Sequence, residues 1–194
     1  MVFPLGRCAA PPIRPAEDHL LNTRKKSPLV GGGAGRSRRT LSITPRQGAR
    51  RKTSVCTHAL AASRGDTLAT FAAWRRARPD LQVPSQAQLN PPLWELGHLG
   101  WFQERWTLRF PQRPRGCAAD ADAPLSAPLR PGADALYDSS RVPHASRWTL
   151  PLPSPEQTLA DLARQLAATL AALQPLPPDD DDDDALYFFR LALL

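Results

Sequence analysis

Helical periodicity constrains the fold of this chain more than any other feature of its sequence. The clearest case starts at Ser154, an N-cap residue that is followed by Pro155 at the first helical position and by Gln157, which completes a capping box. Apolar residues then recur at spacings of three and four until Pro175 ends the pattern. The stripe consists of Leu159, Leu162, Leu166, Leu170 and Leu173. This pattern predicts an amphipathic helix that packs on other helices.

Three further segments are predicted to be helical. The first covers 58–78 and is stopped by Pro79, and the second starts with Asn90 as N-cap and ends near Phe110. The third begins near Ala185, and its apolar pattern is still running at the last residue. The predicted buried face of the first helix is made by Leu60, Thr67, Leu68, Phe71 and Trp74. Long amphipathic helices without strand signals predict an all-α, bundle-like fold whose fourth helix is incomplete.

Charge divides the chain into two parts. Residues 1–56 carry 12 Lys/Arg against Glu17 and Asp18, are rich in Pro, Gly and Ser, and lack sustained apolar periodicity. Such a composition predicts a disordered basic arm. Residues 57–194 are slightly acidic, contain all five Trp, and are long enough to bury a core. We therefore predict a helical domain over 57–194.

Two connections interrupt this helical domain. A Pro- and Gly-rich loop over 111–153 shows no clear helix, but Tyr137, His144 and Trp148 indicate that its second half packs on the bundle. An acidic linker over 179–184 precedes the last helix. It lacks the glycine and the terminal glutamate of a calcium-binding loop. We interpret it as a solvated linker whose last aspartates favour the positive end of the helix that follows.

His98 is the candidate metal ligand. Four side chains share its face at helical spacing: Trp94, Trp101, Phe102 and Arg105. An aromatic wall keeps an imidazole neutral and therefore able to bind a metal ion, although a histidine with a purely structural hydrogen bond fits the same pattern. Glu95 is the expected second partner of this imidazole. Gly97 and Gly100 each weaken the helix by about 1 kcal/mol, which indicates that another segment approaches the backbone closely.

Three stretches of the sequence together resemble a known family. They are NPPLWELGHLGWFQERW, LYDSSRVPHASRWTLPLPSPEQT and DDALYFFRLAL, and they lie in collinear order over residues 63–194. They resemble the N-terminal DinB-like domain of the ergothioneine synthase family, and most of all its selenoneine synthase branch. The resemblance implies a four-helix bundle joined to a second domain of the formylglycine-generating-enzyme type. It also implies a non-haem Fe(II) that uses O2 to join sulfur or selenium, from a thiol or selenol donor, to trimethylhistidine.

In that family three histidines hold the iron, and His98 matches the first of them. The family pattern continues after Phe-Phe-Arg-Leu-Ala-Leu with His-Glu-x-x-His, which supplies the other two. Here the sequence ends at Leu194, before those positions. We therefore expect a truncated domain that is inactive alone. A homo-oligomer or a separate chain would complete the bundle.

Four other residues are candidate contacts for a substrate or a cleft: Arg105, Arg141, Tyr137 and His144. A guanidinium can clamp a carboxylate with two parallel hydrogen bonds. Arg147 is a further candidate for a substrate contact, and Arg109, on the helical face of His98, is open between a salt bridge and a cleft contact. Each of these residues also has a structural interpretation, as a salt bridge, a packing contact or a loop-anchoring hydrogen bond. His58 is expected to face solvent.

Two other functions remain open at this point. An incomplete bundle exposes apolar helix faces, which favours an assembly or binding module. The basic arm favours non-specific binding of nucleic acid, and its composition also resembles a transit peptide. The arm is also open to the interpretation that it is not natural coding sequence.

The remaining composition bears on the compartment. Three scattered Cys argue against a zinc ribbon or a disulfide framework. No apolar run approaches the ~20 residues of a membrane-spanning helix. Residues 1–10 are not followed by the apolar region of a secretory signal peptide. We expect a cytoplasmic protein that does not bind membranes.

Overall fold

The computed structural model describes residues 45–176 and 184–193, with side chains described from Ser54 onward. Within these ranges every regular element is helical, which confirms the predicted all-α class. The longer elements are α1 (Pro45–Ala77), α2 (Pro92–Glu104), α4 (Pro155–Leu173) and α5 (Asp184–Leu191). The shorter ones are η1, a π-helical turn (Arg105–Arg109), η2 (Arg113–Ala118), α3 (Ala133–Tyr137) and η3 (His144–Trp148).

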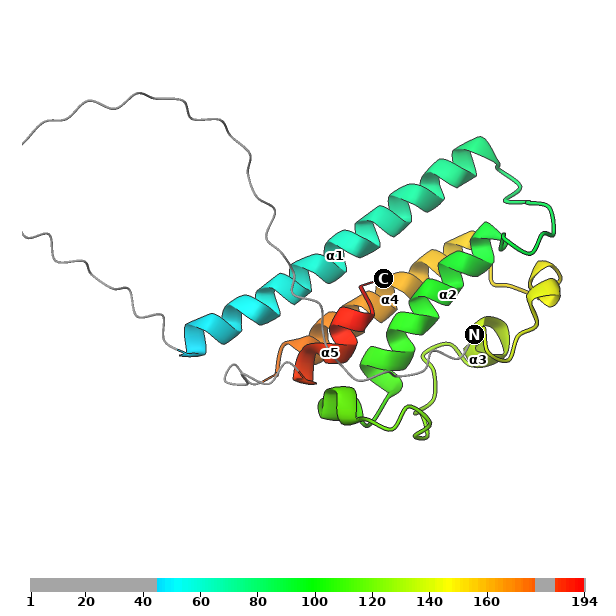
Figure 1. Ribbon diagram of the computed structural model, residues 1–194. Helices are drawn as coiled ribbons and strands as arrows, with labels where there is room; N and C mark the ends of the chain where they lie inside the picture. The colour runs from blue at the N-terminus through cyan, green and yellow to red at the C-terminus, as the bar shows by residue number, and fades with distance from the viewer. Residues whose placement is uncertain (1–44, 177–183, 194) are drawn as a thin grey trace, which may run out of the picture. The chain divides into compact units, whose positions relative to one another are not determined.

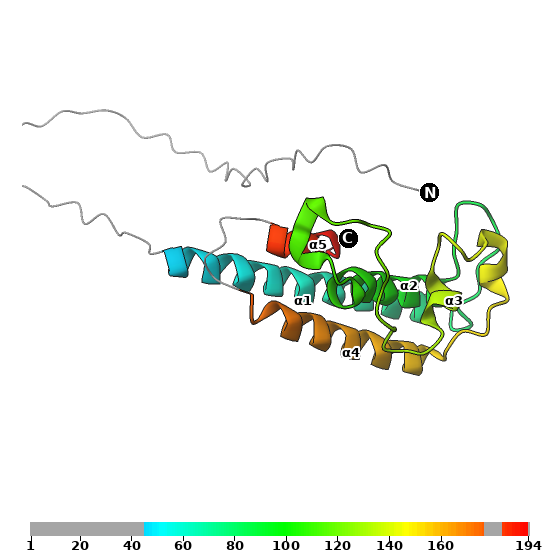
Figure 2. The ribbon, with the colours of Figure 1, turned by 90° about the horizontal axis from the view of Figure 1, so that it is seen from below.

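The long helices lie side by side. α2 and α4 run antiparallel to α1, and α5 returns along the first half of α1 (Figures 1 and 2). One apolar cluster joins α1, α4 and α5 through Leu60, Leu173 and Phe189. A second cluster joins α1, α2 and α4 around Phe71 and Leu96. The apolar stripes predicted from sequence thus meet in a helical bundle.

The first helix begins earlier than its sequence predicts. α1 starts at Pro45, so residues 45–56, which we predicted to be disordered, are helical. No proline interrupts the chain from 46 to 78, and the basic run is rich in Arg, Lys, Gln and Ala, which favour helix. The rest of the predicted arm, residues 1–44, lies outside the described residues. So does most of the acidic linker, 179–183.

The predicted buried face of α1 is only partly right. Leu60 and Phe71 are buried, but Leu68 and Trp74 are 37% and 42% exposed. The buried residues recur from Cys56 at about four-residue steps, and Leu68 lies about 80° round the helix from Leu60. Trp74 faces a groove that no described segment fills.

The two predicted helix starts have different outcomes. The capping box of α4 is confirmed, because Ser154 Oγ accepts from the Gln157 amide at 3.2 Å and Gln157 Oε1 accepts from the Ser154 amide at 3.0 Å. The N-cap at Asn90 is wrong, because α2 is capped at Pro91 without a side-chain hydrogen bond. Asn90 instead donates to the Glu95 carboxylate. The end of this helical segment at Phe110 agrees with prediction.

A polar layer crosses the bundle between the two apolar clusters. Six polar side chains there are almost completely buried: Arg64, Gln103, Glu104, Thr107, Gln165 and Thr169. The Glu104 carboxylate accepts from the Leu129 amide at 2.6 Å and from Gln165 Nε2 at 2.8 Å. Arg64 donates to Gln103 Oε1 at 2.8 Å, and burial lowers its pKa to about 10. These directional bonds fix how α1, α2 and α4 are rotated relative to one another.

The long connection is more structured than predicted. It contains α3 and the short turns η2 and η3, so the expectation of no clear helix is wrong for those residues. Its packing on the bundle is confirmed, because Tyr137 is 4% exposed in a cluster with Trp94 and Trp101. Among the described helices, none combines the length and the apolar character needed to cross a bilayer.

Candidate functional site

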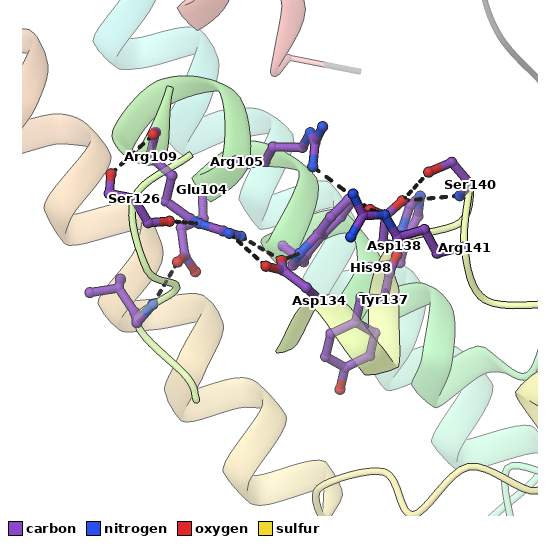
Figure 3. A network of polar contacts seen from close by, with 12 residues as sticks. His98, Glu104, Arg105, Arg109, Ser126, Asp134, Tyr137, Asp138, Ser140 and Arg141 are labelled. Carbon is purple, nitrogen blue, oxygen red and sulfur yellow. Dashed lines mark hydrogen bonds and ion pairs between the residues drawn. The ribbon is translucent and has the colours of Figure 1, made fainter. Parts of the chain in front are cut away.

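His98 lies on α2 against the connection that contains α3. Its Nδ1 is 2.8 Å from the backbone carbonyl oxygen of Tyr137. The imidazole stacks on Trp94, with ring centroids 4.8 Å apart and planes 11° from parallel, and on Trp101 at 5.7 Å. Figure 3 shows His98 beside Tyr137 and Asp138. The predicted aromatic face around His98 is therefore present.

The hydrogen bond to Tyr137 determines the tautomer of His98. A carbonyl oxygen only accepts, so Nδ1 carries the proton and Nε2 keeps its lone pair. Burial lowers the pKa of His98; the Tyr137 hydrogen bond and the charge of Glu95 oppose this shift. The imidazole is thus held neutral, in the state that binds metal ions. Glu95 was the expected hydrogen-bond partner of this ring, but its carboxylate accepts from Asn90. The partner of His98 Nδ1 is the Tyr137 carbonyl.

α3 packs closely on α2 because Gly97 leaves room for the Tyr137 ring and because side-chain hydrogen bonds hold α3 in place. A Cβ atom at Gly97 would overlap the Tyr137 ring, and one at Gly100 would overlap Gln165, which confirms the predicted close approaches. Trp94 Nε1 donates to the Leu136 carbonyl at 2.8 Å.

Asp134 is a second anchor of α3. Trp101 Nε1 donates to Asp134 at 2.6 Å, and Arg109 forms a bidentate pair with the same carboxylate at 2.7 Å for each bond (Figure 3). These hydrogen bonds, led by those from Arg109, lower the pKa of Asp134. The sequence left Arg109 open between a salt bridge and a cleft contact, and the structure places it in the salt bridge.

Arg147 covers the other side of the aromatic stack. Its guanidinium lies 4.1 Å from the Trp94 ring centroid and donates to Asn90 Oδ1 at 2.8 Å. Desolvation lowers the pKa of Arg147, and Glu95 opposes that shift. Arg147, Trp94, His98 and Trp101 therefore form a continuous stack. The sequence offered Arg147 as a substrate contact and did not predict its place on the Trp94 ring.

Arg105 and Arg141 flank Asp138 at the edge of the site. Their nitrogens lie 3.8 Å and 3.6 Å from Asp138 Oδ2 (Figure 3). Both line a polar cavity of about 350 Å³ together with Asp134 and Asp138. The Arg105 guanidinium also lies 5.4 Å from the ring centroids of Trp101 and Trp106. Two of the four predicted contact residues are thus brought together.

The other two predicted contact residues lie elsewhere. The Tyr137 ring is buried against Gly97, and burial raises the pKa of its phenol to about 12. His144 is half-buried, and its Nε2 is 2.8 Å from the Leu89 carbonyl oxygen. This matches the loop-anchoring interpretation of His144. His58 is exposed, as predicted.

The described residues supply one good metal ligand. Nε2 of His98 is available, and the Nδ1–H bond to a carbonyl is the arrangement usual for a ligating histidine. In the part of the chain that the structure describes, no group of three or more His, Cys, Asp or Glu side chains could hold a metal ion. Protein sites for iron and zinc need about three ligands. The described residues alone therefore do not fit a complete Fe(II) site.

The structure is thus an all-α bundle in which one helix carries a neutral histidine, His98, as a candidate metal ligand on an aromatic face. The sequence model of the DinB superfamily matches residues 59–188, and the chain belongs to that superfamily. The chain is also similar to proteins named hercynine oxygenase. Identity is 38% over 91 residues for the protein of Mycolicibacterium thermoresistibile and 36% over 89 residues for that of Mycobacterium tuberculosis.

A third hercynine oxygenase, from Mycolicibacterium smegmatis, is 34% identical over 89 residues. Each similarity covers 46% of this chain but only 18% or 19% of the relative. The matched part thus spans less than a fifth of the length of these relatives.

Proposed function

We propose that this chain serves as the DinB-like part of an Fe(II)- and O2-dependent enzyme of the ergothioneine and selenoneine synthase type, in which His98 is one iron ligand. The observation that carries the proposal is the state of His98. Its Nδ1–H is bound to the Tyr137 carbonyl, and an aromatic stack keeps the ring neutral with Nε2 available. The similarity to hercynine oxygenases supports the same reaction class, because hercynine is a trimethylated histidine.

The chain's own contribution is to orient one imidazole and to exclude water around it. His98 would be one of the residues that hold the iron, and a bound iron would supply the oxygen chemistry. Because the described residues provide one of the ligands, we propose that the chain alone does not catalyse the reaction. The other ligands come from residues outside the described ranges or from another chain.

Arg105 and Arg141 are the proposed contacts for a substrate carboxylate. Both line the polar cavity beside Asp138, at distances from Asp138 that are long for charge-assisted hydrogen bonds. A carboxylate could therefore compete for these guanidinium groups. The nature of the sulfur or selenium donor does not follow from these two residues.

An anaerobic Fe(II) titration, followed by calorimetry, tests the role of His98. We expect the present chain to bind Fe(II) more weakly than micromolar. A chain extended after Leu194 by a helical segment with His-Glu-x-x-His should bind it tightly. In the extended chain, His98→Ala should abolish binding, whereas His144→Ala, a change at a histidine that anchors a loop, should not. The proposal is wrong if the present chain binds Fe(II) at micromolar concentration and converts hercynine with a thiol or selenol donor unaided.

A further inference from the structure

The peptide unit between Tyr137 and Asp138 is held from both sides. Its carbonyl oxygen, which belongs to Tyr137, accepts from Nδ1 of His98 at 2.8 Å. Its N–H, which belongs to Asp138, donates to the backbone carbonyl of Asp134 at 3.1 Å. A peptide unit is planar, so its N–H and its C=O turn together. The direction in which the carbonyl meets the imidazole of His98 is therefore linked to the position of Asp134.

The side chain of Asp134 ties α3 back to the helical segment that carries His98. Its carboxylate accepts from Trp101 Nε1 at 2.6 Å and from Nη1 and Nη2 of Arg109 at 2.7 Å each (Figure 3). Trp101 belongs to α2, and Arg109 is the last residue of η1, which follows α2 directly. The hydrogen bonds therefore form a closed ring, which runs from α2 and η1 through Asp134 and α3 back to His98 on α2.

α3 depends on this tie for its position. It has only five residues, and a helix of that length is not stable by itself. Its N-cap is Gly132, which provides no side-chain hydrogen bond. Arg109, in contrast, is firmly held, because its side chain is 4% exposed and its Nε donates to the Ser126 carbonyl at 2.8 Å. A fixed cation on η1 thus determines where the first turn of α3 lies.

We propose that Asp134 is a positioning residue for His98, which it orients through the peptide unit between Tyr137 and Asp138. In this role Asp134 keeps the proton of the imidazole on Nδ1 and leaves Nε2 free. The consequence for metal binding rests on the proposed function, but the orientation and the tautomer of the ring do not. Asp134 also borders the polar cavity, yet its two oxygens already accept three hydrogen bonds, so a direct substrate contact is not its role.

Two other contacts hold α3 on α2, but neither acts on the peptide unit that meets the imidazole. Trp94 Nε1 donates to the carbonyl of Leu136, one peptide unit earlier. The Tyr137 ring packs on Gly97, which fixes a side chain and not a peptide plane. Removal of the Asp134 carboxylate should therefore leave α3 on α2 but loosen the turn that presents the carbonyl.

Nitrogen NMR of the iron-free chain tests this proposal. Correlation spectra of protein with isotope-labelled histidine distinguish a protonated ring nitrogen from a bare one, and His98→Gln identifies the signals of His98. The spectra are recorded well above the usual histidine pKa of 6.5, so that the ring is neutral. We expect His98 of the wild-type protein to be protonated on Nδ1.

Asp134→Asn is the main variant, because an amide keeps an acceptor for Trp101 but breaks the two-bond pair with Arg109. The ratio of Nδ1-protonated to Nε2-protonated His98 should fall about threefold to tenfold, as expected for the loss of one ordinary hydrogen bond. Arg109→Lys should act in the same direction, because an ammonium group cannot form the fork. The double variant should show no more than the larger single effect, since both changes break the same pair.

A control variant separates positioning from loss of stability. Leu173→Val trims a fully buried side chain in the cluster that joins α1, α4 and α5, away from α3. It should lower the free energy of unfolding, measured with urea, yet leave the tautomer ratio of His98 unchanged.

Three outcomes would overturn the proposal. The first is a wild-type His98 that is protonated on Nε2. The second is an unchanged tautomer ratio in Asp134→Asn, which would make Asp134 a purely structural anchor. The third is a shift of the same size in Leu173→Val. Failure of the Fe(II) titration would leave this proposal intact, because the tautomer is measured without iron.

Discussion

Two faces of α2 differ in what covers them. The face of His98 is closed by α3, which is held by directional bonds from Trp94, Trp101 and Arg109. The face of Leu99, a side chain that is 37% exposed, opens into a groove between α1 and α2 whose apolar lining includes Phe71 and Leu96. The difference shows that a Pro- and Gly-rich connection without helical periodicity can cover a helix when side-chain hydrogen bonds anchor it. An apolar helix face without such anchoring hydrogen bonds, like that of Leu99, is not covered by another segment of the described chain.

Two tryptophans test the difference most directly. Trp94→Ala on the closed face should lower the free energy of unfolding by about 3–5 kcal/mol, because a side chain 1% exposed leaves a cavity and the Leu136 carbonyl loses its donor. Trp74→Ala on the open face should cost less than about 1 kcal/mol, because this side chain is 42% exposed. Urea unfolding measures both. Similar losses for the two variants would contradict the distinction between the faces.

The aspartate that anchors α3 provides the second test. Asp134→Asn should lower the free energy of unfolding by about 1–3 kcal/mol, because the buried Arg109 loses its charged partner. Asp66→Asn on the open face is the matched control, and it should change stability by less than about 0.5 kcal/mol.

This effect should depend on pH. The pKa of Asp134 is lowered in the folded protein. Its stabilisation is therefore fully present above the usual aspartate pKa and is lost as the pH falls through the lowered value. The difference between the wild-type protein and Asp134→Asn should shrink in acid. A constant difference from neutral pH down to strong acid would contradict the ion pair as its cause.

Two glycines distinguish a close approach from open space. Gly97→Ala should destabilise by about 1–3 kcal/mol, because the new methyl group overlaps the Tyr137 ring. Gly65→Ala in α1 meets no atom within 4 Å and should stabilise by about 0.5–1 kcal/mol, the usual gain from replacing glycine in a helix. Thermal unfolding of both variants, followed by circular dichroism, gives the two signs. A stabilising Gly97→Ala would mean that α3 is not held against α2.

The smallest expected effect is the contribution of His98 to the pH dependence of the free energy of unfolding. Its pKa is lowered in the folded protein, so on acidification the unfolded chain takes up this proton first. Stability should therefore fall as the pH drops below the usual histidine value of 6.5. His98→Gln keeps a donor for the Tyr137 carbonyl and removes the titration, so its unfolding free energy should fall less steeply from pH 7 to pH 5. Identical slopes would show that His98 does not titrate as a buried neutral ring.

Much of the His98 face could be predicted from sequence, because residues three and four apart on a helix share a face whatever surrounds them. Trp94 and Trp101 follow from that rule. The partner of His98 could not be predicted, because it is a backbone carbonyl 39 residues away in a loop without periodicity. Glu95 was expected there because it is close in sequence, but Asn90 is its hydrogen-bond partner.

The same limit applies to the bundle interior. The leucine stripe of α4 is real, yet Thr158, Gln165 and Thr169 are among its most buried residues. Polar residues at these positions look like a solvated face in the sequence. Thr158 Oγ1 donates to the Ser154 carbonyl of its own helix. Gln165 and Thr169 are instead buried because Glu104 and Thr107, on α2 and η1, are their hydrogen-bond partners. Such pairs form only after two helices have been brought together.

The sequence by itself determined the presence of the four longer helices, the capping box at Ser154 and the aromatic neighbours of His98, because these depend on the geometry of a few consecutive turns. Only the tertiary structure decided the tautomer of His98, the polar layer and the groove beside Leu99. Each of these arises where segments distant in the chain meet. Hydrogen-bond partners and uncovered apolar surface there follow from packing between helices, which local periodicity does not specify.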